Sequence, residues 1–86
     1  MARIEVRQKD TEIFEVTVRE TATTTHLVVL SQDYYQKLTE GKVSPEMLIE
    51  KSFEFLLERE SNTMILARFD LPVIGDYFPE YEKNIV

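Results

Sequence analysis

The sequence predicts an α+β fold, in which a three-stranded antiparallel β-meander is followed by a helix-turn-helix corner and an ordered C-terminal tail. Residues 2–7 and 12–19 alternate between apolar and polar side chains, with the period of two that is typical of half-buried strands. Residues 44–60 instead gather their apolar side chains on one face of a helix. The tail, residues 64–81, is rich in large apolar side chains, although chain ends are usually polar and loose.

We expect strands over residues 2–7, 12–19 and 25–30, with residues 21–25 mainly in a loop. Short connections between consecutive strands favour antiparallel pairing. The third strand is apolar on both faces, whereas the first two are apolar on one face only. The side chains expected to point inward from the first two strands are Ile4, Val6, Phe14, Val16 and Val18.

The main helix is expected to run from Ser44 to Glu60 and to present the largest packing surface of the chain. Ser44 suits the N-cap, because its hydroxyl can accept from the unpaired amides of the first turn. Pro45 suits the first helical position, where its missing N–H costs nothing. A shorter helix before it is expected to begin at Ser31 and to end at Gly41.

The tail from Met64 to Tyr81 is expected to pack down, with Asp70 capping a single helical turn over residues 71–74 and Gly75 ending it. Its aromatic side chains suit either the core of their own domain or a partner, since tyrosine and phenylalanine are common anchors at interfaces. The candidate interaction residues are Phe69, Leu71, Ile74, Tyr77, Phe78 and Tyr81.

Length and composition predict one globular domain over residues 1–86. The chain is 43% hydrophobic and 30% charged, which is ordinary for a folded protein. Its net charge of −6 opposes nucleic-acid binding over most of the surface. It contains no cysteine, no apolar run long enough to span a bilayer and no apolar signal-peptide segment, so we expect a soluble cytoplasmic protein.

The sequence lacks the residue combinations on which common active sites depend. His26 is the single histidine and no spaced carboxylate cluster accompanies it, so we expect no metal site. No Gly-x-Ser-x-Gly motif is present, and Gly41 and Gly75 are too isolated to form a phosphate loop. The repeated Glu50, Glu54 and Glu58 are expected to form a solvated stripe. We therefore expect no enzyme and no cofactor.

Basic side chains gather on the outer face of the predicted sheet, where Arg3, Arg7 and Arg19 share one side. They can contact phosphate groups. Glu5 and Glu15 are interleaved with them, so we favour cross-strand ion pairs.

The middle of the chain carries a pattern that is found in a known family. A strand runs into Leu30-Ser31, Gly41 marks a turn, and Ser44 caps a second helix that contains Leu48-Ile49 and Leu57-Glu58-Arg59. This arrangement, over residues 27–60, resembles the ribbon-helix-helix regulators and antitoxins. The resemblance implies an intertwined homodimer that places paired strands in the DNA major groove.

The sequence also departs from that family in three respects. The first helix is about one turn short, and two further strands precede the candidate ribbon. The ribbon, residues 26–30, is mostly apolar, whereas base reading needs polar side chains. The same residues also suit a small α+β domain with a capped helical corner.

Two functions remain open. We expect a small non-enzymatic interaction protein, a homodimer whose tail lies in or beside the interface, because two chains that pack together remove more apolar surface from water. The tail can also dock on another protein. The alternative is a DNA-binding regulator or antitoxin of the ribbon-helix-helix type. We expect no membrane partner and no nucleic-acid partner.

Overall fold

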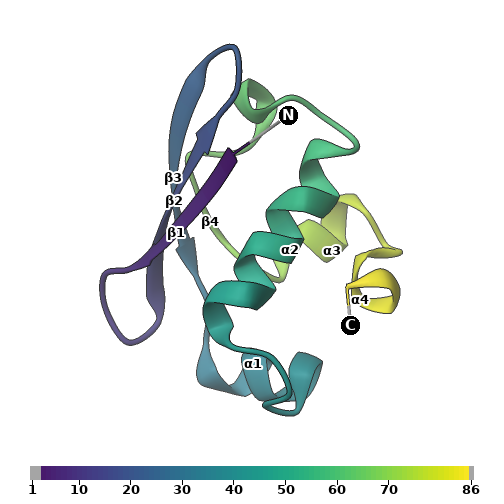
Figure 1. The fold of residues 1–86 in the computed structure, drawn as a ribbon. Coiled ribbons are helices and arrows are strands. Elements are labelled where there is room, and N and C mark those ends of the chain that lie inside the picture. The colour runs from purple at the N-terminus through teal and green to yellow at the C-terminus, as the bar shows by residue number, and fades with distance from the viewer. Residues whose placement is uncertain (1–2, 86) are drawn as a thin grey trace.

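A four-stranded sheet with helices packed on one of its faces forms the protein in the computed structural model, which describes residues 3–85 (Figure 1). The strands are β1 (Arg3–Gln8), β2 (Ile13–Arg19), β3 (Thr23–Val29) and β4 (Arg68–Asp70), in that spatial order. The first three pair antiparallel, and β4 runs parallel to β3. The predicted α+β class and antiparallel meander are confirmed, and the sheet has one strand more than predicted.

The helices are α1 (Gln32–Thr39), α2 (Pro45–Leu57), α3 (Val73–Tyr77) and α4 (Tyr81–Asn84), with a short 3₁₀ turn, η1 (Asn62–Met64), after α2. Both predicted serine caps are present. The Ser31 hydroxyl accepts from the Tyr34 amide and the Ser44 hydroxyl from the Met47 amide, each at 3.1 Å. Each cap satisfies an amide that has no partner inside its own helix.

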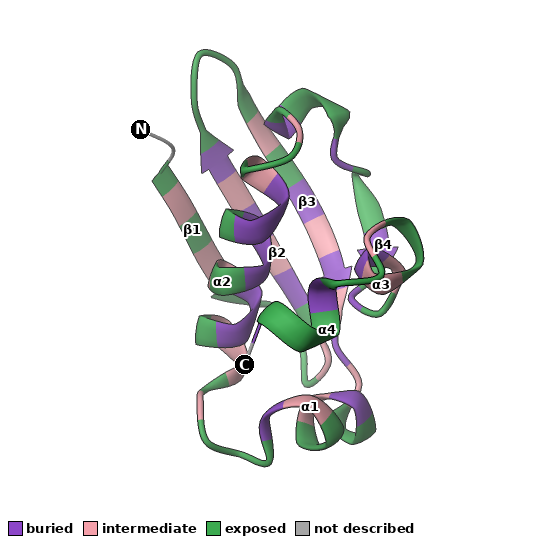
Figure 2. Ribbon diagram, turned by 90° about the vertical axis from the view of Figure 1, so that its right-hand side faces the viewer, coloured by how far each residue is buried: buried purple, intermediate pink, exposed green. Residues whose placement is uncertain are grey.

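The core lies between the sheet and α2, as the buried positions show (Figure 2). Alternate side chains of β2 point at the helix, as predicted, because the period of two sends every second residue to the same face. The buried apolar side chains include Phe14, Val16, Val18 and Val28 from the strands, and Leu48, Ile49, Phe53, Phe55 and Leu56 from α2.

Several element boundaries differ from the sequence prediction. The main helix ends at Leu57 and not at Glu60, where the Arg59 amide donates to the Leu56 carbonyl three residues earlier, in the tighter pattern of a 3₁₀ turn. The first helix ends before Gly41, since Glu40 already adopts a left-handed conformation, with φ of 54°. β3 begins at Thr23 instead of residue 25, because pairing with β2 continues as far as Arg19.

The tail differs most from its prediction. Asp70 lies in β4 and caps no helix, and Gly75 lies inside α3 instead of ending it. Pro72 takes the N-cap position of α3. The physical reason is the pairing with β3, which draws residues 68–70 into the sheet and moves the start of the helix along the chain.

The tail nevertheless packs down, and it does so in its own chain. Phe69, Leu71, Ile74, Tyr81 and Ile85 are buried and belong to the same apolar cluster as α2. The Ser52 and Tyr81 hydroxyls lie 2.6 Å apart, and Ser52 also donates to the Leu48 carbonyl. These five side chains of the tail are therefore part of the core.

Candidate interaction site

An apolar groove lies between the end of α2, the segment from Met64 to Phe69, and α3; we call it the tail groove. Its volume is about 180 Å³, below the roughly 300–1,000 Å³ of typical small-molecule sites. This size suits one or two inserted side chains. The lining includes Leu56, Ile65, Phe69, Ile74 and Phe78, with Glu60 as the acidic member.

Exposed apolar side chains surround the tail groove. Met64, Leu66 and Tyr77 are 70%, 47% and 67% exposed. Two further large apolar residues among those described are exposed, Ile13 and Met47, and neither lines the groove. Clustered exposed apolar groups on a small domain indicate a contact surface, whereas scattered ones do not.

The structure divides the six interaction residues that the sequence suggested. Phe69, Ile74, Tyr77 and Phe78 line the tail groove, although Phe69 and Ile74 are mostly buried beneath it. Leu71 and Tyr81 are fully buried in the core of their own chain and do not line the groove.

Sequence reasoning did not include Met64 and Leu66 among its candidate residues, although both are exposed and line the groove. A signal was present, because both are large apolar residues directly after the polar stretch Ser61-Asn62-Thr63. A connection that is apolar and exposed at once is unusual, since connecting segments run over the surface of a protein.

A chain of hydrogen bonds fixes one wall of the groove to β3. The Nδ1 atom of His26 lies 2.8 Å from the Leu66 carbonyl oxygen, and its Nε2 atom lies 2.9 Å from the Thr24 hydroxyl. A carbonyl can only accept, so His26 donates from Nδ1, and in the neutral ring Nε2 then accepts from the Thr24 hydroxyl. The side-chain amide of Asn62 donates to Thr24 in turn. The buried His26 is a satisfied structural group.

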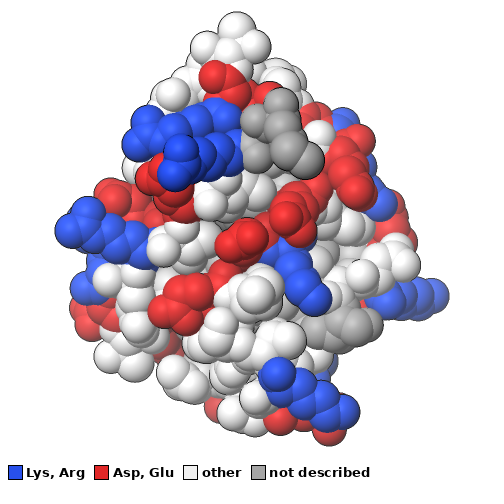
Figure 3. Space-filling view, viewed as in Figure 1, with Lys and Arg blue, Asp and Glu red and all other residues white. Residues whose placement is uncertain are grey.

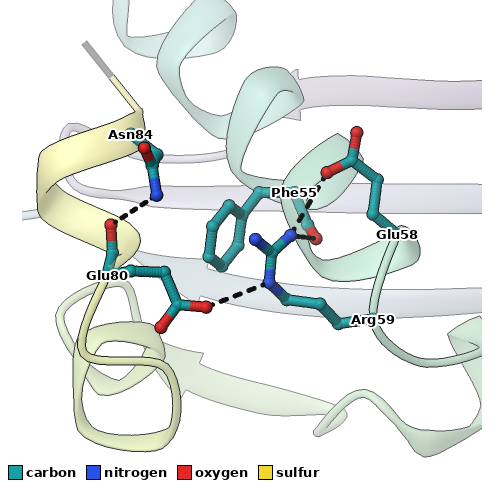
Figure 4. Close-up of polar contacts among 5 residues, drawn as sticks. All are labelled: Phe55, Glu58, Arg59, Glu80 and Asn84. Carbon is teal, nitrogen blue, oxygen red and sulfur yellow. Dashed lines mark hydrogen bonds and ion pairs between the residues drawn. The ribbon is translucent and has the colours of Figure 1, made fainter.

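The C-terminal end of α2 is tied to the end of the tail through Arg59 (Figure 4). Its guanidinium carbon lies 3.6 Å from the centroid of the Phe55 ring, and its Nη1 donates to the Phe55 carbonyl at 2.9 Å. Its Nε lies 3.4 Å from a Glu80 carboxylate oxygen. The Asn84 side-chain amide also donates to the Glu80 carbonyl. These contacts hold α4 against α2.

Two buried tyrosines sit between α1, α2 and the tail. Burial raises the pKa of Tyr81 to about 12, although its hydrogen bond with Ser52 acts in the opposite direction. Burial also raises the pKa of Tyr34, and so does the hydrogen bond that its hydroxyl donates to Glu82 at 2.7 Å. Both phenols therefore favour the neutral form in the folded chain.

Alkaline pH is expected to destabilise the fold. A tyrosine in the unfolded chain ionises near pH 10, whereas Tyr81 in the fold ionises at about 12. This contribution to stability is complete below about pH 10 and is lost as pH rises towards about 12, a loss of about 2–3 kcal/mol. Urea unfolding across this window measures it. Tyr81→Phe should lose less stability over the same window, and an equal loss would contradict this assignment.

Charge is distributed unevenly between the two layers. A diagonal line of acidic side chains follows α2 across the helical face (Figure 3), where Glu54 and Glu58 are exposed as predicted, whereas Glu50 is half-buried. On the outer face of the sheet, Glu5 contacts Arg19 at 3.0 Å and Arg3 at 3.5 Å. The hydrogen bond from Arg19 lowers the pKa of Glu5. The favoured cross-strand ion pair is present.

Other kinds of site find little support in the described part of the chain. Among residues 3–85, no group of three or more histidine, aspartate or glutamate side chains is placed to hold a metal ion. No helix in this range has the length and apolar character that a bilayer crossing needs. Comparisons with models of known families, with curated proteins and with solved structures find no match to this chain.

Proposed function

We propose that the protein is a small non-catalytic interaction domain that works as a homodimer, with the tail groove at the contact between the two copies. The observation that carries this proposal is the exposure of Met64, Leu66 and Tyr77 around an apolar groove. Large apolar side chains stay exposed at a cost in free energy unless a partner covers them.

A second copy of the chain is the occupant that best fits the size of the groove and the packing of the tail. The buried side chains of the tail belong to the core of their own chain, so only the exposed side chains Met64, Leu66 and Tyr77 remain for a partner. The groove is too small for most organic ligands but accepts one side chain such as methionine, leucine or tyrosine. Met64, Leu66 and Tyr77 at the edge of the groove in a second copy are side chains of these three kinds. A twofold dimer uses the same patch on both copies, so an exposed side chain of each copy can enter the groove of the other.

The proposal that the protein is non-catalytic is based on the hydrogen bonds of its single histidine, His26. This histidine is buried and uses both ring nitrogens in hydrogen bonds, so neither nitrogen is available as a general base. The ribbon-helix-helix alternative gains no specific support from the position of β3. This strand is paired with β2 on one side and β4 on the other, within its own chain, whereas a ribbon pairs with the partner's strand.

Light scattering at micromolar concentration is expected to give about twice the chain mass of 10.1 kDa. A folded monomer at that concentration would contradict the homodimer. The mass does not depend on which surface is used, so it tests self-association separately from the groove.

Leu66→Lys is expected to weaken self-association at least tenfold. Burying a leucine is worth about 1.5–3 kcal/mol, and about 1.4 kcal/mol is a tenfold change in affinity. Sedimentation of the purified variant across a concentration series measures the dissociation constant. Met47→Lys is the matched control, because Met47 is 44% exposed, close to the 47% of Leu66, but lies outside the groove. Equal effects of the two variants would remove the groove from the interface.

A further inference from the structure

Only alternate residues of β4 direct their main-chain hydrogen-bonding groups at β3, and this leaves the β4 edge of the sheet open. The Leu27 amide donates to the Ala67 carbonyl at 2.8 Å, and the Leu71 amide donates to the Val29 carbonyl at 2.9 Å. With Leu27 opposite Arg68, these bonds turn the main chain of residues 67, 69 and 71 towards β3.

The main-chain groups of the alternate residues, Arg68 and Asp70, consequently point away from the sheet. No turn, cap or side-chain hydrogen bond found within residues 3–85 uses them. An open strand edge of this kind is a template for pairing with another chain. Both residues are exposed, and β4 is the last strand on its side of the sheet.

We propose that β4 pairs antiparallel with β4 of a second copy about a twofold axis at Phe69, a deduction that rests on the homodimer proposed above. Arg68 then lies opposite Asp70 of the second copy, and Asp70 lies opposite Arg68. These are the residues whose main chains point outward, so each such pair exchanges two hydrogen bonds. The two four-stranded sheets become one continuous sheet.

The side chains of β4 are self-complementary in this register. The order of side chains along β4 is basic, apolar, acidic, from Arg68 through Phe69 to Asp70. A second copy that runs antiparallel places an acidic, an apolar and a basic side chain opposite these three positions. Directly opposed residues share a face of the sheet, so each arginine meets an aspartate. Neither Arg68 nor Asp70 forms an ion pair within 4.0 Å among residues 3–85. Both charges are therefore available to a partner.

The same register brings the two tail grooves together. Phe69 lines the groove, and in the dimer it lies opposite Phe69 of the second copy on the helical face of the sheet. The two grooves thus flank the twofold axis. The strand edge supplies register and hydrogen bonds, while Met64, Leu66 and Tyr77 supply apolar contact.

A pair of charge reversals tests this arrangement. Arg68→Asp places aspartate opposite aspartate in its own dimer, and Asp70→Arg places arginine opposite arginine. Each variant alone is expected to dissociate at least tenfold more readily than the unchanged protein in sedimentation experiments. When the two variants are mixed, every opposed pair becomes Asp–Arg, so a heterodimer with restored affinity is expected.

Hydrogen exchange of backbone amides gives an independent readout on the unchanged protein. The Arg68 and Asp70 amides are expected to exchange more slowly as protein concentration rises through the dissociation constant. The Met47 amide, which is bonded to the Ser44 cap, is expected to exchange independently of concentration.

The outcomes separate the two proposals. If the unchanged protein is a monomer, the homodimer itself is wrong. If it is a dimer but neither charge reversal weakens it, or if mixing the variants restores nothing, the β4 pairing is wrong while the homodimer stands. A dimer that Leu66→Lys disrupts, without concentration-dependent protection at Arg68 and Asp70, also overturns the strand pairing.

Discussion

Cutting the chain after Ala67 is expected to unfold the domain. The cut removes β4 and five buried side chains, Phe69, Leu71, Ile74, Tyr81 and Ile85. Removing one large buried apolar side chain typically costs about 2–5 kcal/mol, and a domain of this kind is held by only about 5–15 kcal/mol. Five such losses sum to about 10–25 kcal/mol, which is most or all of the stability available to a domain of this kind.

Circular dichroism and amide NMR spectra of the truncated chain measure this effect. The expected result is loss of dispersed amide signals and of a cooperative melting transition. Adding residues 68–86 as a separate peptide should recover part of the native spectrum, because the missing contacts are with α2 and β3. A truncated chain that melts cooperatively with native-like spectra would show that the tail is an appendage.

Tyr81→Ala is expected to be the most damaging single substitution in the tail, at about 3–5 kcal/mol, which is the range for removing a buried aromatic ring. Tyr81 is completely buried, its hydroxyl contacts Ser52, and its ring packs edge-on against Phe55 at 5.3 Å between centroids. The variant therefore loses apolar burial, an aromatic contact and a hydrogen bond together. Urea unfolding of the two proteins gives the difference.

Tyr77→Ala is the matched control, because it removes the same side chain from the same segment at an exposed position. Its unfolding free energy should change by no more than about 0.5 kcal/mol, as for other surface positions. Its self-association should weaken, since Tyr77 lies on the rim of the tail groove. Equal destabilisation by the two substitutions would contradict the division of the tail into core and contact residues.

Local sequence signals were sufficient for the strands of the meander and for the two helix starts. The alternation in β2 correctly placed Phe14, Val16 and Val18 inside, because a period of two leaves only one register with a buried apolar face. Ser31 and Ser44 marked the starts of the two helices, because a serine hydroxyl accepts a hydrogen bond from a first-turn amide that has no partner inside the helix.

The fourth strand was not predictable in the same way. A strand of three residues, Arg68–Asp70, is too short to show alternation. Its partner β3 lies some forty residues earlier in the chain, so the pairing is set by tertiary structure.

The tail residues were identified as a group but could not be assigned individually. Tyr77 and Tyr81 are both aromatic and four residues apart, yet one is exposed and the other completely buried. Their difference depends on Pro72 starting α3 and on the turn at Pro79 between α3 and α4. Composition and periodicity predict neither the start of α3 nor the direction of this turn, so the groove could not be predicted from the sequence.

Intermolecular nuclear Overhauser effects in a dimer of labelled and unlabelled chains test the central claim most directly. We predict contacts between copies at Met64, Leu66 and Tyr77, and between the α-protons of Phe69 in the two copies, since such directly opposed residues lie about 4.5 Å apart at Cα. Intermolecular contacts confined to another surface, such as that around Ile13 or Met47, would contradict the tail groove as the interface.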